Sequence, residues 1–96
     1  MFGHKKEQKH QVVTDGRFEL ERDGHVAYLQ YSLGGGVLEL IHSEVPPELR
    51  GQGLAAKLAQ SALDYARENN LKVDIVCPSV ADFVAKHPEY ADLVLE

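Results

Sequence analysis

Apolar and polar residues alternate near the start of the chain with a period of two, which is typical of half-buried β-strands. Phe18 and Leu20 alternate with charged neighbours, and residues 26–33 are rich in side chains that favour strands. The segments R-D-G at 22–24 and G-G-G at 34–36 are turn signals. The pattern therefore predicts two antiparallel strands joined by a hairpin, with a second turn after them.

Residues 37–42 form the next predicted strand and are almost continuously apolar. A run of this kind is expected of a central strand that is covered on both faces. It completes a meander of antiparallel strands. Residues 11–13 are a candidate for an additional strand at the edge of the sheet.

The period changes to that of an amphipathic helix over residues 53–68. Leu54, Leu58, Ala62 and Tyr65 share one stripe of this helix, and polar residues occupy the opposite side. Two asparagines follow, and asparagine readily adopts the left-handed conformation that ends helices.

A second buried strand is predicted over residues 71–77, so strand, helix and strand form a parallel crossover. A second helix follows directly, where Ser79 and Asp82 have the spacing of a capping box. Pro88 interrupts it, and residues 90–95 form a last helical turn or two. We therefore predict an α+β fold in a single small domain, an antiparallel meander followed by a β-α-β unit, with a mixed sheet flanked by helices.

Composition restricts the classes of protein that fit this chain. Its 96 residues suffice for one domain, and no apolar run approaches the ~20 residues that cross a bilayer. The net charge of −5 argues against a nucleic-acid surface and suits a cationic amine substrate, although acidity also serves solubility. We expect residues 1–10 to be a flexible polar tail without a secretory signal, and residues 11–96 to be the domain. The single cysteine fits a reducing, cytoplasmic environment.

The segment V-P-P-E-L-R-G-Q-G-L-A-A, residues 45–56, has the chemistry of an anion-binding loop. Its prolines end the preceding strand, and Gly51 and Gly53 allow the backbone to approach a ligand closely. Arg50 adds a fixed positive charge. The first amide N–H groups of the following helix have no partner within the helix and point towards the loop. Together these features predict a phosphate site.

Two other interpretations of the loop are open. Residues 51–56 also fit G-x-G-x-x-[G/A], the dinucleotide-binding fingerprint. That motif begins directly after a strand, however, and needs an acidic residue at the end of the next strand, where this chain has Cys77. The other interpretation is a glycine-rich turn without a ligand, although a turn alone does not need Arg50.

The loop also resembles that of a known family. V-x-P-x-x-R-G-x-G-L-A is similar to the acetyl-CoA pyrophosphate loop of the Gcn5-related N-acetyltransferases, whose core signature is [Q/R]-x-x-G-x-[G/A]. Arg50, Gly53 and Ala55 occupy the signature positions. The segments V-C-P-S-V-A-D-F-V at 76–84 and K-H-P-E-Y at 86–90 resemble a branch of very short stand-alone domains, which carry a Cys near the acetyl group.

This resemblance implies that acetyl-CoA is the cofactor and that loop amides hold its pyrophosphate. The pantetheine arm would pair with the backbone of residues 42–45, in a cleft between the two strands that flank the long helix. Amides near the end of the first of these strands would polarise the thioester carbonyl. The implied cofactor-binding residues are Val45, Arg50, Gly51, Gln52, Gly53, Leu54 and Ala55, and no metal ligands are implied.

The candidates for catalysis are Cys77, His42 and Glu44. Cys77 precedes a helix N-terminus, which favours a thiolate, and the resemblance places it beside the acetyl group. A thiolate there would accept the acetyl group, but a free Cys is often only structural, and direct attack by an amine needs no enzyme nucleophile. Imidazole titrates near neutral pH, so His42 is either a general base or a structural residue, and Glu44 shares its face of the strand.

The chain departs from the larger family in two places. Typical members carry a Tyr that protonates the leaving CoA sulfur where this chain has Phe83 and Val84, and nothing in the sequence places Tyr90 there. A pair of helices that usually forms much of the acceptor site is also missing. We predict an acetyl-CoA-dependent N-acetyltransferase for a primary amine of a small molecule, a protein Lys or an N-terminus; the alternative is a CoA-binding or acyl-CoA-binding module with little turnover. We expect a monomer or weak homodimer, without nucleic-acid or membrane partners.

Overall fold

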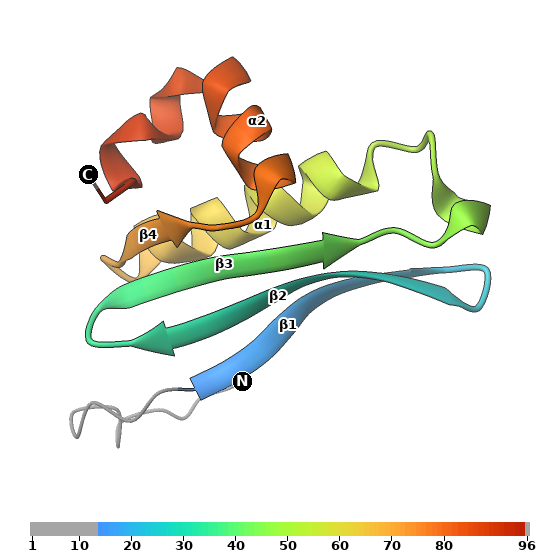
Figure 1. The fold of residues 1–96 in the computed structure, drawn as a ribbon, viewed down its shortest axis with the longest axis horizontal. Coiled ribbons are helices and arrows are strands. Elements are labelled where there is room, and N and C mark those ends of the chain that lie inside the picture. The colour runs from blue at the N-terminus through green and yellow to red at the C-terminus, as the bar shows by residue number, and fades with distance from the viewer. Residues whose placement is uncertain (1–13, 96) are drawn as a thin grey trace.

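The computed structural model describes residues 14–95, which form a four-stranded sheet with helices packed on one face (Figure 1). The strands lie in chain order across the sheet: β1 (Thr14–Arg22), β2 (His25–Gly34), β3 (Val37–Glu44) and β4 (Lys72–Ile75). The first three pair antiparallel, whereas β3 and β4 are parallel. The predicted meander and β-α-β unit are confirmed, while the predicted tail and the candidate strand at 11–13 lie outside the described residues.

The helices cover one face of the sheet. The α-helices are α1 (Leu54–Glu68) and α2 (Pro78–Lys86), and the short 3-10 helices are η2 (Pro47–Leu49) and η3 (Pro88–Leu93). Helix α1 contacts every strand, and α2 contacts both α1 and the β3–β4 pair. The prediction that residues 37–42 are covered on both faces is wrong. Buried residues alternate with half-buried ones along β3, because only one face of the strand meets the core.

The start of α2 also differs from the prediction. Cys77, and not Ser79, is the N-cap residue, since its carbonyl accepts the first helical hydrogen bonds from Val80 and Ala81, both at 3.2 Å. Pro78 occupies the first helical position, for which its fixed φ angle is suited. Asp82 makes no capping bond and pairs instead with Lys86, Oδ2 to Nζ 3.2 Å. The true N-cap places the cysteine directly at a helix N-terminus.

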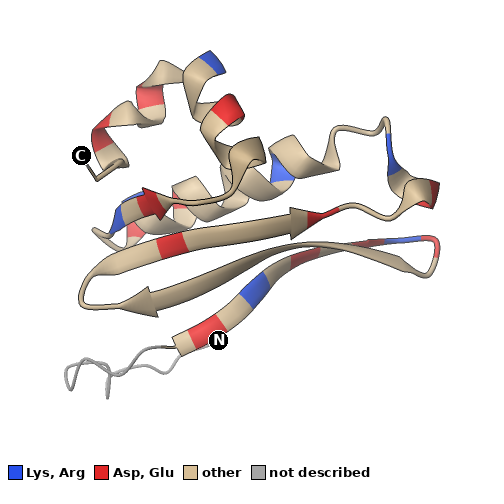
Figure 2. Cartoon of the chain, viewed as in Figure 1, with Lys and Arg blue, Asp and Glu red and all other residues tan. Residues whose placement is uncertain are grey.

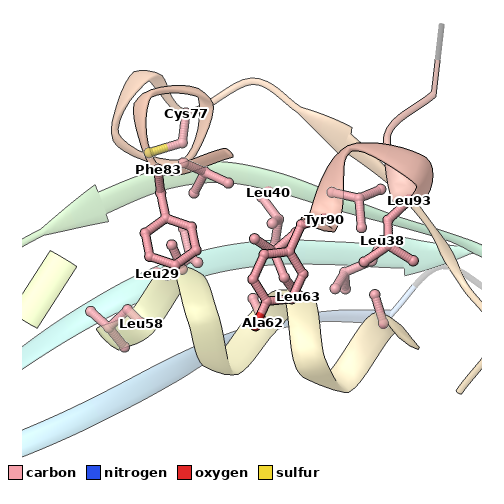
Figure 3. Close-up of a cluster of buried hydrophobic side chains, with 14 of the residues drawn as sticks. Leu29, Leu38, Leu40, Leu58, Ala62, Leu63, Cys77, Phe83, Tyr90 and Leu93 are labelled. Carbon is pink, nitrogen blue, oxygen red and sulfur yellow. The ribbon is translucent and has the colours of Figure 1, made fainter. Parts of the chain in front are cut away.

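The hydrophobic core lies between the sheet and the helices, and no described polar or charged residue is buried in it (Figure 3). Leu29 and Leu40 contribute from the sheet, Leu58 and Leu63 from α1, and Phe83 from α2. Burial of an aliphatic or aromatic side chain of this size stabilises a fold by roughly 1.5–3 kcal/mol. The core thereby fixes the strand ends and helix starts that carry the candidate site.

The C-terminal segment is held against α1 and the outer edge of β4. The hydroxyl of Tyr90 donates to Asp64 Oδ1 at 2.7 Å, and Arg67 donates to Asp92 Oδ1 at 3.0 Å. The N–H of Leu95 donates to the carbonyl of Val73 in β4 at 2.8 Å. The segment K-H-P-E-Y therefore ends in a fixed structural contact with the long helix.

Replacing Tyr90 by Phe keeps the buried ring and removes only the hydroxyl that donates to Asp64. We expect the free energy of unfolding to fall by about 1 kcal/mol, which lowers the melting temperature by about 4–8 °C. Thermal denaturation measures the change. Tyr65→Phe is the matched control, because the Tyr65 hydroxyl makes no hydrogen bond to any residue between 14 and 95. An equal decrease in the free energy of unfolding in both variants would contradict a specific role for the hydrogen bond from Tyr90 to Asp64.

Candidate functional site

The loop between β3 and α1 presents a row of amide N–H groups without acceptors. Gly53 is the N-cap of α1, and the first hydrogen bond of the helix runs from Lys57 N to Gly53 O at 3.1 Å. Within the described chain, none of the N–H groups of residues 51–56 donates to a protein acceptor. Unpaired donors at the positive end of a helix dipole form a ready site for a phosphate group.

Two glycines shape this row of donors. Gly51 and Gly53 have φ angles of 84° and 73°, in the left-handed region that side chains disfavour. A Cβ added at either position would meet no atom within 4 Å. The glycines are therefore required by the backbone conformation, and the space beside them is open to a ligand.

Side chains hold the loop at both of its ends. Arg50 Nε donates to the carbonyl of Val45 at 3.2 Å, and Gln52 Oε1 accepts from Arg22 Nη1 at 3.2 Å. Figure 2 shows basic positions both in the loop and at the adjoining β1–β2 hairpin. The sequence analysis did not identify Arg22, because its proximity to the loop depends on how the hairpin packs and no local pattern indicates it.

Strands β3 and β4 separate just after their last pair, Leu40 with Ile75. The carbonyl of Leu40 accepts from the N–H groups of both Val76 and Cys77, each at 2.9 Å. Beyond this point β3 continues to Glu44, whereas β4 has ended. We call the separated segments, residues 41–45 and 76–77, the β3–β4 fork. In the fork β3 has no pairing with β4, so an extended ligand chain can pair with this edge of the strand.

A β-bulge in β3 decides which side chains point to each side of the fork. Gln30 is paired with His42, but Tyr31 is paired with Leu40, so Ile41 is the extra residue. Because of the bulge, Ser43 shares the helix-covered face of the sheet with its partner Leu29. His42 and Glu44 project from the opposite, open face.

On the open face, His42 Nε2 lies 3.0 Å from Glu44 Oε1, and both side chains are about half exposed, 55% and 50%. The ring of Tyr28 lies beside the imidazole, with 6.3 Å between ring centroids. A carboxylate at this distance holds the imidazole in one orientation. Because both side chains are half exposed, the pair is accessible from the open face.

On the helix-covered face, Cys77 is only 2% exposed, and its Sγ lies 3.3 Å from Ser43 Oγ. Burial raises the pKa of the thiol, but hydrogen bonds from the Ser43 hydroxyl and from the backbone N–H groups of Val80, Ser79 and Ser43 outweigh it, so the pKa lies below its usual value. Ser43 was missed by the sequence analysis, since only the bulge turns it towards Cys77. Cys77 and His42 lie on opposite faces of the sheet and do not form a pair.

Two side chains of the K-H-P-E-Y segment, Tyr90 and His87, make contacts within the C-terminal part of the fold. Tyr90 is turned towards Asp64 and away from the fork. The His87 ring stacks on Phe83 with centroids 4.1 Å apart, as a residue that packs the C-terminal segment. Among residues 14–95 no cluster of His, Cys, Asp and Glu has the arrangement of a metal site. In the same part of the chain, no helix has the length and apolar character needed to cross a membrane.

The dinucleotide interpretation does not fit this geometry. Its glycine motif begins directly after the strand and needs an acidic residue at the end of the next strand. Here η2 separates the end of β3 from Gly51, and Cys77 follows β4. The loop is therefore not a motif of that type.

Comparisons with known proteins show which family the chain is similar to. The family model described as GCN5-related N-acetyl-transferase matches residues 17–93. Protein NATD1 of Danio rerio is 31% identical over 93 residues, which cover 95% of this chain and 80% of that protein. Protein NATD1 of Bos taurus is 38% identical over 56 residues, 58% of this chain, and the match spans 50% of the bovine protein.

A solved structure is also similar. The NMR solution structure of a GCN5-like putative N-acetyltransferase from Staphylococcus aureus aligns with a TM-score of 0.63 at 28% sequence identity. The alignment covers 84% of this chain and 80% of that chain. The similarity therefore extends over the sheet, the loop and both α-helices and not over the loop alone.

Proposed function

Because the chain belongs to the GCN5-related N-acetyltransferase family, we propose that it transfers the acetyl group of acetyl-CoA to a primary amine. The acceptor is a small molecule, a protein Lys or a protein N-terminus. The observation that carries the proposal is the row of unpaired N–H groups at residues 51–56, in the loop that leaves the β3–β4 fork and is tied back to it by Arg50 and Val45. One end of this arrangement suits a diphosphate, and the other suits an extended amide-containing arm.

The residues of the loop and fork divide the binding work in this proposal. The pyrophosphate would be held by main-chain N–H groups of the loop and by the charge of Arg50. The N–H of Val45, which has no acceptor in the described chain, would polarise the thioester carbonyl. The residues assigned to acetyl-CoA are Val45, Arg50, Gly51, Gln52, Gly53, Leu54 and Ala55.

His42 and Glu44 would act on the acceptor. Their position on the open face lets His42 Nε2 take a proton from the amine nitrogen, while Glu44 stabilises the imidazolium that results. The amine then attacks the thioester carbon directly. Holding both reactants at the fork supplies the orientation that this attack requires.

Acetyl-CoA should stabilise the folded protein, because it binds the native loop and not the unfolded chain. At about 100 times its dissociation constant the gain is about 2.7 kcal/mol, which raises the melting temperature by on the order of 10 °C. Acetyl-pantetheine, which lacks the diphosphate, should give a much smaller shift, and NAD should give none. Equal shifts with acetyl-CoA and acetyl-pantetheine would contradict the role of the loop.

A second candidate function is a CoA-binding or acyl-CoA-binding module with little turnover. One observation favours it: the helix after β4 carries Phe83 where typical family members have a Tyr, and the Tyr90 hydroxyl donates to Asp64. Release of free CoA with a panel of primary amines separates the two functions. Binding without amine-dependent release under every condition would favour the module.

A further inference from the structure

The helix-covered side of the β3–β4 fork carries a hydroxyl–thiol pair, Ser43 Oγ and Cys77 Sγ, 3.3 Å apart. The two residues come from the separated ends of the two strands. We propose that Ser43 is a positioning residue that holds the Cys77 thiol at the fork, where Sγ gives its proton to the CoA sulfur that leaves during acetyl transfer. This inference rests on the proposed function and assigns the proton donor that the reaction needs.

The backbone fixes both partners of the pair. The N–H of Cys77 donates to the Leu40 carbonyl at 2.9 Å, so the residue is tied to the last paired position of β3. Its own carbonyl begins α2, which fixes it from the other side. The bulge at Ile41 turns Ser43 to the same face. A proton donor needs this kind of support, because small displacements of a reacting group reduce the rate strongly.

The surroundings of Sγ suit a group that loses a proton and regains it. The Ser43 hydroxyl can donate to a thiolate at this position, and the backbone N–H groups of Ser79, Val80 and Ser43 also stabilise it. No charged group contributes, since Cys77 lies in the apolar core cluster with Leu40 and Phe83 (Figure 3). A thiol whose pKa is lowered in this way gives its proton to a departing thiolate more readily than an ordinary thiol does.

The position of the base argues for a proton donor and against a nucleophile. A thiol nucleophile needs a base to take its proton. His42 and Glu44 lie on the opposite face of the sheet, and the side-chain partner of Sγ in the described chain is a hydroxyl. As a donor, Cys77 needs no such base.

The step balances in atoms and electrons. The amine nitrogen bonds to the acetyl carbon, the carbon–sulfur bond breaks, and its electron pair remains on the departing sulfur. Cys77 Sγ gives that sulfur a proton, and His42 Nε2 takes a proton from the amine on the open face. Solvent then returns a proton to Sγ and removes one from the imidazole, so the enzyme is unchanged.

Titration of Cys77 without any CoA tests the positioning role. The chain has one cysteine, so thiolate absorbance near 240 nm, corrected with Cys77→Ala, reports this group alone. We expect Ser43→Ala to raise the midpoint by about one pH unit, because the thiolate loses a donor. Ser43→Thr should restore the midpoint, and Ser61→Ala on the exposed side of α1 should leave it unchanged. A wild-type midpoint in Ser43→Ala would overturn the inference.

Kinetics and mass test the donor role. Cys77→Ala should lower kcat about 10²–10⁴-fold with little change in the KM for acetyl-CoA, and Ser43→Ala should lower kcat less and shift its pH profile. Intact mass after incubation with acetyl-CoA should show no Cys77-dependent acetyl adduct. Such an adduct would overturn the donor role. If the protein binds and turns over acetyl-CoA but Ser43→Ala behaves as wild type, this inference fails and the proposed function stands; if acetyl-CoA does not bind, both fail.

Discussion

Gly53→Glu should abolish binding of CoA, with an affinity at least about 100-fold lower, equivalent to about 2.7 kcal/mol. Gly53 has a φ angle of 73°, so any side chain strains the N-cap of α1. The new carboxylate would also enter the open space beside the unpaired N–H groups of residues 51–56. There it would compete with the diphosphate for the same donors and repel its charge. Isothermal titration calorimetry with CoA measures the loss.

Gly36→Glu is the matched control for this change. Gly36 also has a positive φ, 79°, and a Cβ there also meets no atom within 4 Å. It lies in the β2–β3 turn, at the end of the sheet away from the loop (Figure 1). This variant should lose a similar amount of stability and keep its affinity for CoA. Undiminished affinity in Gly53→Glu would remove the loop from the CoA site.

Features that depend on local sequence could be predicted well. The start of helix α1 was predicted within one residue. Its signals, the apolar stripe and the glycine before the helix, are contained in a short stretch of sequence. The two hairpins could also be predicted, because their turn residues are local signals in the sequence. The capping box at Ser79 failed for a local reason too, since Pro78 takes the first helical position and moves the N-cap to Cys77.

Features that depend on pairing between strands could not be predicted. The bulge at Ile41 lies where the register between β3 and β2 shifts by one residue. No residue type in β3 indicates that position in the sequence. An unbulged strand would put Leu40, His42 and Glu44 on one face. The contact of Ser43 with Cys77 and the approach of Arg22 to Gln52 both follow from such long-range packing.

The bulge also gives the fork two chemically different sides. The open side carries the exposed imidazole–carboxylate pair of His42 and Glu44, which can accept a proton. The covered side carries the Ser43–Cys77 pair, which can give one. Acetyl transfer to an amine needs both events, one at the attacking nitrogen and one at the departing sulfur. Strand β3 lies between the two sides, so in the proposed reaction the base and the acid would be kept apart.

His42→Gln should lower kcat about 10²–10⁴-fold, because the amide cannot accept the proton of the amine. The thermal shift with acetyl-CoA should remain in the same variant. His25→Gln is the matched control: His25 is a partly exposed residue of the same meander, with Nδ1 3.8 Å from Glu48 Oε1, and its replacement should leave kcat unchanged. A wild-type kcat in His42→Gln would show that His42 is not the base.

Glu44→Gln, measured alone and together with His42→Gln, decides which member of the pair takes the proton. If Glu44 only orients and stabilises the imidazole across their 3.0 Å contact, its replacement costs less than that of His42, and the double variant is no slower than His42→Gln. If Glu44 is itself the base, the order reverses, and His42→Gln retains most of its activity. Additive losses would mean that the two side chains act separately, contrary to their contact. Because both side chains are about half exposed and lie outside the core, these variants should fold as the wild type does, so differences in rate report the chemistry at the open face.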